Sequence, residues 1–157
     1  MSNSDRNLAI RRRALVPRES CPMAIAADVL GDKWTLLILR EAFYGVVRYD
    51  DMLQDLGAPR STLTDRLNKL VKHKVLERRP YQLPGERQRY LYALTNRGKE
   101  LSPLFIAMTK WGEDHLLEGK APVQAVQQNT GEAVYISLTN EQGQPVDISQ
   151  VTLSKCP

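Results

Sequence analysis

Residues 60 to 72 concentrate side chains that could bind a nucleic acid. They carry hydroxyl, amide, carboxylate and cationic groups at Arg60, Ser61, Thr62, Asp65, Arg66, Asn68, Lys69 and Lys72. Short hydroxyl and amide side chains hydrogen-bond the edges of bases, whereas arginine and lysine bind phosphate oxygens. Residues 59 to 74 contain five cations and one anion, which gives a net charge of +4. The chemistry that this stretch favours is recognition of DNA.

Charge elsewhere in the chain is consistent with a polyanionic partner. Residues 1 to 20 have a net charge of +3, and residues 121 to 157 have a net charge of −2. Positive charge gathered in the first two thirds of a protein attracts nucleic acid. A charged helix face can also be merely solvated, and residues 60 to 72 taken alone suit both interpretations. The neighbouring elements favour DNA recognition.

The spacing of apolar residues predicts the elements that would position this surface. A helix begins near Pro59, and its apolar positions fall on one face, at Leu63, Leu67, Leu70 and Val71. An amphipathic helix over 48–56 precedes it. Residues 75–81 and 88–95 are typical of two strands joined by a turn rich in proline, glycine and charge. The polar set is therefore expected on the outer face of a helix that is followed by a hairpin.

Further helices are expected on both sides of this unit. Apolar spacing predicts helices over 22–30 and 32–45, of which the second is apolar almost all round and suits the middle of a fold. A long amphipathic helix is expected over 96–117, bent near Pro103 because proline lacks a backbone N–H. Residues 119–157 are expected to form two or three short strands.

This order of elements is typical of a winged helix-turn-helix, a mainly α fold with a β hairpin. The helix after Pro59 would enter the major groove, and the helix over 48–56 would cross the DNA backbone. Arg87 and Arg89, beside the hairpin turn, would reach phosphates or the adjacent minor groove. We expect a basic N-terminal arm (1–20), a winged-helix domain (21–118) and a small β-rich C-terminal extension (119–157).

Other classes of protein find little support in the sequence. No nucleophile–base pair, glycine-rich phosphate loop or metal-ligand spacing is present, so neither an enzyme nor a bound cofactor or metal is expected. Two cysteines cannot build a disulfide framework. The chain has no apolar stretch long enough to span a membrane, and its beginning lacks the pattern of a secretion signal. A cytoplasmic location is expected by default.

Four blocks of the chain resemble the HxlR family of bacterial winged-helix regulators. They read CPMAIAADVLGDKWTLLILREAFYG, RYDDMLQDLG, STLTDRLNKLVKHKVLERRPY and RYLYALTNRGKELSPLFIAMTKWG. The resemblance runs from about Cys21 to about His115. It implies a homodimer that binds a pseudo-palindromic operator of double-stranded DNA with two recognition helices and represses or activates nearby genes; we expect a repressor. It also implies that the N- and C-terminal helices hold the dimer, with Met23, Leu104, Met108, Trp111 and His115 at the interface.

The chain departs from the family at two places. Many members have a serine that caps the recognition helix, where this chain has Ala58. Either Ser61 or Thr62 takes over as cap, or the end of the helix is looser by about 1 kcal/mol. Some members carry a cysteine-rich zinc ribbon after the last helix, and residues 120–157 lack its ligands, so a metal-free extension is expected.

Cys21 matches the position of a cysteine that senses oxidants or electrophiles in several members of the family. It lies at a predicted helix start, where the helix dipole favours the thiolate, and Arg18 would act in the same direction. Oxidation would give a sulfenic acid or a disulfide across the dimer, with Cys156 as a further thiol. The alternative is an inert packing residue.

Two rival functions remain open at this stage. In the first, a small ligand between the dimer helices gates DNA binding and no thiol is needed. In the second, the winged helix is a protein-interaction module that does not bind DNA. Salt separates the second from a DNA-binding protein, because DNA affinity falls steeply as salt is added.

Overall fold

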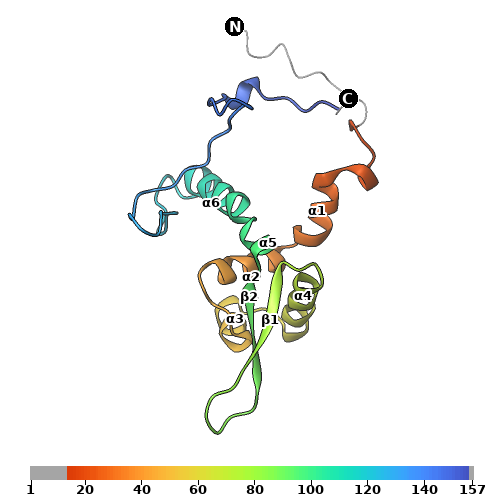
Figure 1. Ribbon diagram of the computed structural model, residues 1–157, viewed down its shortest axis with the longest axis vertical. Helices are drawn as coiled ribbons and strands as arrows, with labels where there is room; N and C mark the ends of the chain where they lie inside the picture. Colours follow the sequence, from red (N-terminus) through yellow and green to blue (C-terminus); the bar gives the residue numbers. More distant parts are fainter. Residues whose placement is uncertain (1–13, 156–157) are drawn as a thin grey trace.

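The computed structural model describes residues 14–155 (Figure 1). Most of the expected arm, residues 1–13, and Cys156 lie outside this range. The elements, in order, are η2 (Arg18–Ser20), α1 (Pro22–Leu30), α2 (Lys33–Phe43), α3 (Tyr49–Leu56), α4 (Arg60–Lys72), β1 (Leu76–Tyr81), β2 (Arg89–Leu94), α5 (Asn96–Lys99), α6 (Ser102–Leu116) and η3 (Ile148–Gln150).

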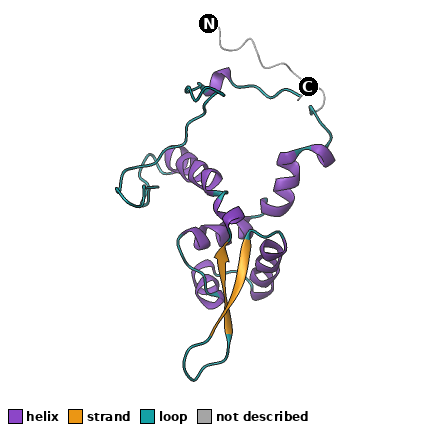
Figure 2. Ribbon diagram, viewed as in Figure 1, coloured by secondary structure: helices purple, strands orange, loops and turns teal. Residues whose placement is uncertain are grey.

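A winged body formed by α2, α3, α4 and the β1–β2 hairpin contains the hydrophobic core (Figure 2). The side chains at its centre are almost completely shielded from solvent: Ile38, Met52, Leu63, Leu67, Leu70 and Leu76. Three of these lie on α4, at the leucines that the helical spacing assigns to one face. Their burial fixes which face of α4 points outward. The mainly α fold with a β hairpin is the one predicted.

Capping and turn residues set the ends of these helices. Asp32 caps α2, because its Oδ1 accepts a hydrogen bond of 3.1 Å from the backbone N–H of Thr35. Gly57 ends α3 with a φ of 60°, a left-handed conformation that glycine adopts without a Cβ penalty. Lys74 adopts a φ of 58° where the chain turns from α4 into β1. The turns between α3, α4 and the wing are thus defined by single residues.

The hairpin is an antiparallel ladder in which Leu76 pairs with Leu94 and Tyr81 pairs with Arg89. The loop between α2 and α3 adds a short third line of pairing beside β2. There, the backbone N–H of Tyr92 donates to the carbonyl of Val47 at 2.7 Å. The wing is consequently attached at its base to the beginning of α3.

The predicted helix over 96–117 is wrong in one respect, since it is two helices, α5 and α6, rather than one bent helix. Pro103 occupies the first turn of α6, where a missing N–H costs nothing. In a continuous helix, the Pro103 ring would clash with the carbonyl of Lys99 and leave it without its donor. The first helix therefore ends at Lys99, and the second begins at Ser102.

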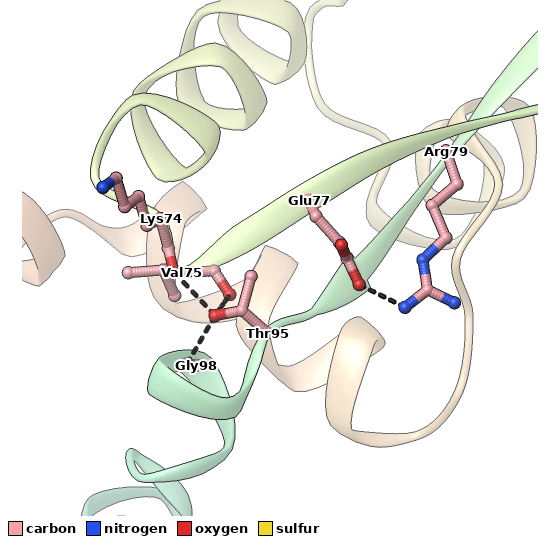
Figure 3. Close-up of polar contacts among 6 residues, drawn as sticks. All are labelled: Lys74, Val75, Glu77, Arg79, Thr95 and Gly98. Atoms are coloured by element: carbon pink, nitrogen blue, oxygen red, sulfur yellow. Dashed lines mark hydrogen bonds and ion pairs between the residues drawn. The ribbon is translucent and has the colours of Figure 1, made fainter.

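A tight junction joins the end of α4, the wing and α5 (Figure 3). The hydroxyl of Thr95 donates to the carbonyl of Lys74 at 2.6 Å and accepts a hydrogen bond from the N–H of Gly98 at 3.0 Å. The backbone N–H of Thr95 also donates to Val75 at 3.1 Å. A Cβ on Gly98 would lie 2.2 Å from the Val75 carbonyl oxygen, so only glycine fits there. The junction fixes how the path to α6 leaves the winged body.

Helices α1 and α6 extend from the same side of the winged body and diverge from each other (Figure 1). Neither helix contains a buried residue. The N-terminal part of α6 is attached to α2 by Phe105, whose ring stacks on Phe43 with centroids 4.9 Å apart. Leu30, the last residue of α1, packs against the core, but large apolar side chains of both helices, among them Met23 and Trp111, are exposed within the single chain.

The C-terminal extension does not form the expected short strands within its described part, residues 119–155. Its β-type pairing is limited to two isolated bridges, Val126 with Ala133 and Thr139 with Pro145. Each closes a small turn around Gly131 or Gly143. Each bridge stands alone because no third segment lies beside it, and an isolated hairpin is only marginally stable in water.

Candidate nucleic-acid interface

The outer face of α4 divides the predicted DNA-contacting residues into two groups. Five of them are exposed to solvent: Arg60, Ser61, Asp65, Asn68 and Lys72. Three are only half-exposed and lie along one flank of the helix: Thr62, Arg66 and Lys69. Positions 61, 65, 68 and 72 follow helical spacing, so the exposed group forms a continuous strip along α4. This strip carries hydroxyl, carboxylate, amide and cationic groups in that order.

Thr64 belongs to the exposed strip and was missed by the sequence analysis. It is three residues after Ser61, a spacing that places two helical residues on the same face and could have identified it. Its Oγ1 lies 3.2 Å from the hydroxyl of Tyr49, which also donates to the carbonyl of Arg60 at 3.2 Å. The first turn of α4 is thus held by the first residue of α3.

Arg66 is tied to the start of α2. Its Nε lies 3.0 Å from Oδ1 of Asp32, and both side chains are about one third exposed, at 34% and 33%. Partial burial acts to raise the pKa of Asp32, but hydrogen bonds from the Thr35 hydroxyl, Arg66 and the Thr35 N–H, together with the charge of Arg66, outweigh it. The pKa of Asp32 therefore lies below its usual value. The guanidinium points at a carboxylate of its own chain.

The beginning of α4 has no side-chain cap, which is the looser of the two helix ends expected from the sequence. Pro59 precedes the first helical residue, Arg60, and neither Ser61 nor Thr62 forms a side-chain cap. The backbone N–H of Leu63 donates to the carbonyl of Pro59 at 3.0 Å, so regular helical bonding starts there. The predicted placement of Pro59 inside the helix is off by one residue.

The wing presents cations whose partners differ. Arg87 is exposed, and no ion pair to it is seen within residues 14–155. Arg89 pairs with Asp50 of α3 at 3.0 Å and with Glu86 at 3.7 Å, which ties the turn end of β2 to α3. Arg78, in the middle of the first strand, is a further exposed cation that was not predicted from the sequence. Its guanidinium lies 4.2 Å from the centroid of the Tyr90 ring.

The residues assigned to a dimer interface lie on open surfaces of α1 and α6. Met23, Leu104, Met108 and Trp111 are all among the exposed large apolar side chains of the chain. Trp111 contacts His115, with ring centroids 5.2 Å apart. Large apolar side chains gathered on exposed helix faces are typical of a surface that binds another protein.

Cys21 is the N-cap residue of α1 and is half-exposed. Arg18, which was expected to favour its thiolate, instead pairs with Asp28 at 2.6 Å. The Arg18 guanidinium is thus engaged by a carboxylate of α1. Within residues 14–155, no cluster of histidine, cysteine or acidic residues is arranged to hold a metal ion, and no helix is long and apolar enough to cross a membrane.

Comparison with known sequences gives one consistent family. Residues 29–120 match the HxlR-like helix-turn-helix family. The HTH-type transcriptional regulator Mb3122 of Mycobacterium bovis is 39% identical over 97 residues, which are 62% of this chain and 60% of that protein. The regulator sll1512 of Synechocystis sp. is 42% identical over 97 residues, covering 61% of this chain and 70% of its own. The match thus spans less than two thirds of the mycobacterial relative.

Solved structures agree with the sequence comparison. The crystal structure of PA1607, a candidate transcription factor, superposes with a TM-score of 0.74 at 34% identity and covers 87% of this chain and 96% of its own. PA1374 from Pseudomonas aeruginosa gives a TM-score of 0.59 at 32% identity, with coverage of 87% and 93%. The reduced redox regulator HypR shares the fold at a TM-score of 0.54 and 23% identity, covering 64% of this chain and all of its own. The chain therefore belongs to the HxlR-like helix-turn-helix family, and the relatives that it matches are named transcriptional regulators.

Proposed function

We propose that this chain acts in the cytoplasm as a homodimeric repressor, which binds a pseudo-palindromic DNA operator with one α4 helix in each of two successive major grooves. The observation that carries the proposal is the exposed strip on α4, from Ser61 to Lys72, on a helix whose other face is anchored by three buried leucines. A helix of this kind can enter the major groove without losing core contacts.

The neighbouring elements support the same placement. The carboxamide of Asn68 can bond an adenine edge, and Lys72, at the end of the strip, can reach a phosphate. The wing begins directly after α4 and carries exposed cations at Arg78 and Arg87, which would contact the backbone or the minor groove. Arg89 and Arg66 are assigned a smaller share, because each already pairs with a carboxylate of the chain.

The proposal is tested by selecting an operator from random DNA and then measuring affinity by fluorescence anisotropy over a range of salt. Asn68→Ala is expected to cost about 1–3 kcal/mol on the selected sequence and to relax the preference at one base pair. Lys72→Ala is expected to weaken binding to all sequences alike and to reduce the salt slope by about one charge. Gln124→Ala, an exposed polar change far along the chain, is the matched control.

Unchanged affinity in both α4 variants would remove α4 from the DNA interface. An affinity that does not fall with salt would instead favour the protein-interaction module, because binding through phosphates releases counterions.

The homodimer is supported by the exposed apolar residues of α1 and α6, which a second copy would cover. Sedimentation equilibrium of the full chain is expected to give a dimer. Trp111→Ser is expected to shift the equilibrium toward monomer, because it removes a large apolar side chain from the surface. A chain that stays monomeric at all concentrations would refute the homodimer. A promoter–reporter fusion, with expression that falls when the regulator is supplied, tests repression.

The signal that releases the operator is proposed to act on Cys21, with a small ligand bound between the helices as the alternative. Support for the thiol comes from its half-exposed position at the start of α1, and from two neighbours of the same fold, one described as the redox regulator HypR. Diamide should release DNA from the natural chain and not from Cys21→Ser. Release from both would assign the signal to a site other than this thiol.

A further inference from the structure

We propose that the C-terminal extension is an arm that packs on α1 and α6 of a second copy of the chain, and that the partner's arm packs on this chain in the same way. This proposal rests on the homodimer proposed above. It assigns the extension a role in holding the two subunits together.

The extension contains many large apolar residues, yet in a single chain they are exposed to solvent. None of residues 119–155 is buried, and only Ala121, Ala125 and Val146 are half-exposed. Nevertheless nine large apolar side chains of the extension are exposed: Val123, Val126, Val134, Tyr135, Ile136, Leu138, Ile148, Val151 and Leu153. Tyr135, Ile148 and Leu153 are exposed to 76%, 72% and 78%. Exposed apolar side chains at this density are typical of a surface that packs against another protein surface.

The occupant follows from what the same chain leaves open. Helices α1 and α6 also contain no buried residue, so the extension does not cover the helices of its own chain. Figure 1 shows it looping beside α6 and then passing, on the side away from the winged body, toward the beginning of the described chain. Two apolar surfaces of one chain that do not meet within it can meet between two copies, because a twofold axis pairs each surface with the other twice. The extension also continues the open surface of α6 through Leu116 and Leu117.

The comparisons separate relatives with such an arm from those without it. Residues 1–118 are three quarters of the chain, so a match to 87% of it, as with PA1607 and PA1374, must include part of the extension. HypR matches only 64% of this chain although all of HypR is covered. The fold therefore exists without an extension, and the arm is an addition to the dimer helices rather than a requirement of the winged body.

Paramagnetic broadening between subunits tests where the arm lies. A spin label is attached at Gln150→Cys in full-length chain carrying Cys21→Ser and Cys156→Ser, and this chain is refolded with an equal amount of unlabelled, ¹⁵N-enriched chain. Only contacts between subunits then broaden the amide signals. We expect broadening at α1 and α6, including Met23 and Trp111. A label at Gln88→Cys, on the wing, is the control and should leave these amides sharp.

Each outcome decides a different statement. In a second sample, the spin-labelled chain itself carries the ¹⁵N, so contacts within one subunit are seen. If the protein is a dimer and the helices are broadened in this second sample alone, the arm folds back on its own chain and the proposal is overturned. If no helix is broadened in either sample, the arm covers neither subunit and the proposal is again overturned. If the protein is a monomer, the homodimer itself is refuted.

The strength of dimerisation gives an independent measurement. Leu153→Ser is expected to raise the dimer dissociation constant at least about tenfold, because the loss of one buried leucine side chain exceeds the 1.4 kcal/mol that corresponds to a factor of ten. Gln142→Ser, an exposed polar change in the same extension, is the matched control. A dissociation constant unchanged in Leu153→Ser and in Ile148→Ser would remove the arm from the interface.

Discussion

Replacing Asp32 by alanine removes several interactions from the start of α2 at once. The carboxylate caps the helix through the N–H of Thr35 at 3.1 Å, accepts from the Thr35 hydroxyl at 2.6 Å and pairs with Arg66 at 3.0 Å. Thr35 is completely buried, so its hydroxyl has no access to water. Arg66, in contrast, takes part only in the ion pair. The variants at the two ends of this pair should therefore differ in cost.

The magnitudes follow from these contacts. Loss of a cap costs about 1 kcal/mol. A buried hydroxyl left without its partner costs about 1–3 kcal/mol. The ion pair is one third exposed and is worth no more than about 1 kcal/mol. We expect Asp32→Ala to destabilise the protein by about 2–4 kcal/mol and Arg66→Ala by less than about 1 kcal/mol.

Urea unfolding followed by circular dichroism measures both values. All variants are compared at one protomer concentration, because in the proposed dimer the free energy of unfolding would depend on it. Asp32→Asn is the informative third variant, since asparagine caps a helix as well as aspartate does but carries no charge. Its cost should lie between those of Arg66→Ala and Asp32→Ala, because the amide keeps one oxygen to accept from the Thr35 N–H, whereas its NH2 group replaces the oxygen that accepts from the Thr35 hydroxyl. Equal losses for Asp32→Ala and Arg66→Ala would show that the ion pair, and not the cap, dominates, which would refute this reasoning.

Three further predictions concern the same body. Because the pKa of Asp32 is lowered by folding, its stabilisation is complete above about pH 4 and is lost as pH falls through the folded-state value, so the stability difference between the natural chain and Asp32→Asn should shrink only in acid. Gly98→Ala places a Cβ 2.2 Å from the Val75 carbonyl oxygen and should cost at least about 1–3 kcal/mol in thermal or urea unfolding, whereas Gly112→Ala, with nothing within 4 Å, should not destabilise the chain. Leu67→Ala empties a completely buried position and should cost about 2–5 kcal/mol, and a loss below 1 kcal/mol would mean that α4 is not anchored as described.

Much of the winged body could be predicted because its signals are local. Apolar spacing places α1, α3 and α4 within a residue or two. The two strands were recognisable from their composition and from the turn between them. These features depend on residues close together in the sequence, where periodicity and side-chain chemistry act directly.

The parts that sequence could not settle depend on distant neighbours. Helical spacing shows that Arg66 lies near the outer face of α4, but it cannot show that Asp32, 34 residues earlier, lies beside it. Thr64 was within reach of the same spacing argument and was overlooked. The extension carries a strand-like composition, yet strands form only when other segments pair with them along their length, and within the described chain this pairing is limited to two isolated bridges.

The junction at Thr95 makes the winged body and the start of the C-terminal helices a single mechanical unit. One threonine bonds the carbonyls of Lys74 and Val75, between α4 and β1, and the N–H of Gly98 in α5, so in the proposed dimer a rotation of α6 would carry α4 and the wing with it. Two half-sites one duplex turn apart, about 34 Å, tolerate little misalignment. A few degrees of change in the angle at which the subunits cross would consequently displace α4 and the wing in concert, and the dimer would leave its operator without either subunit unfolding.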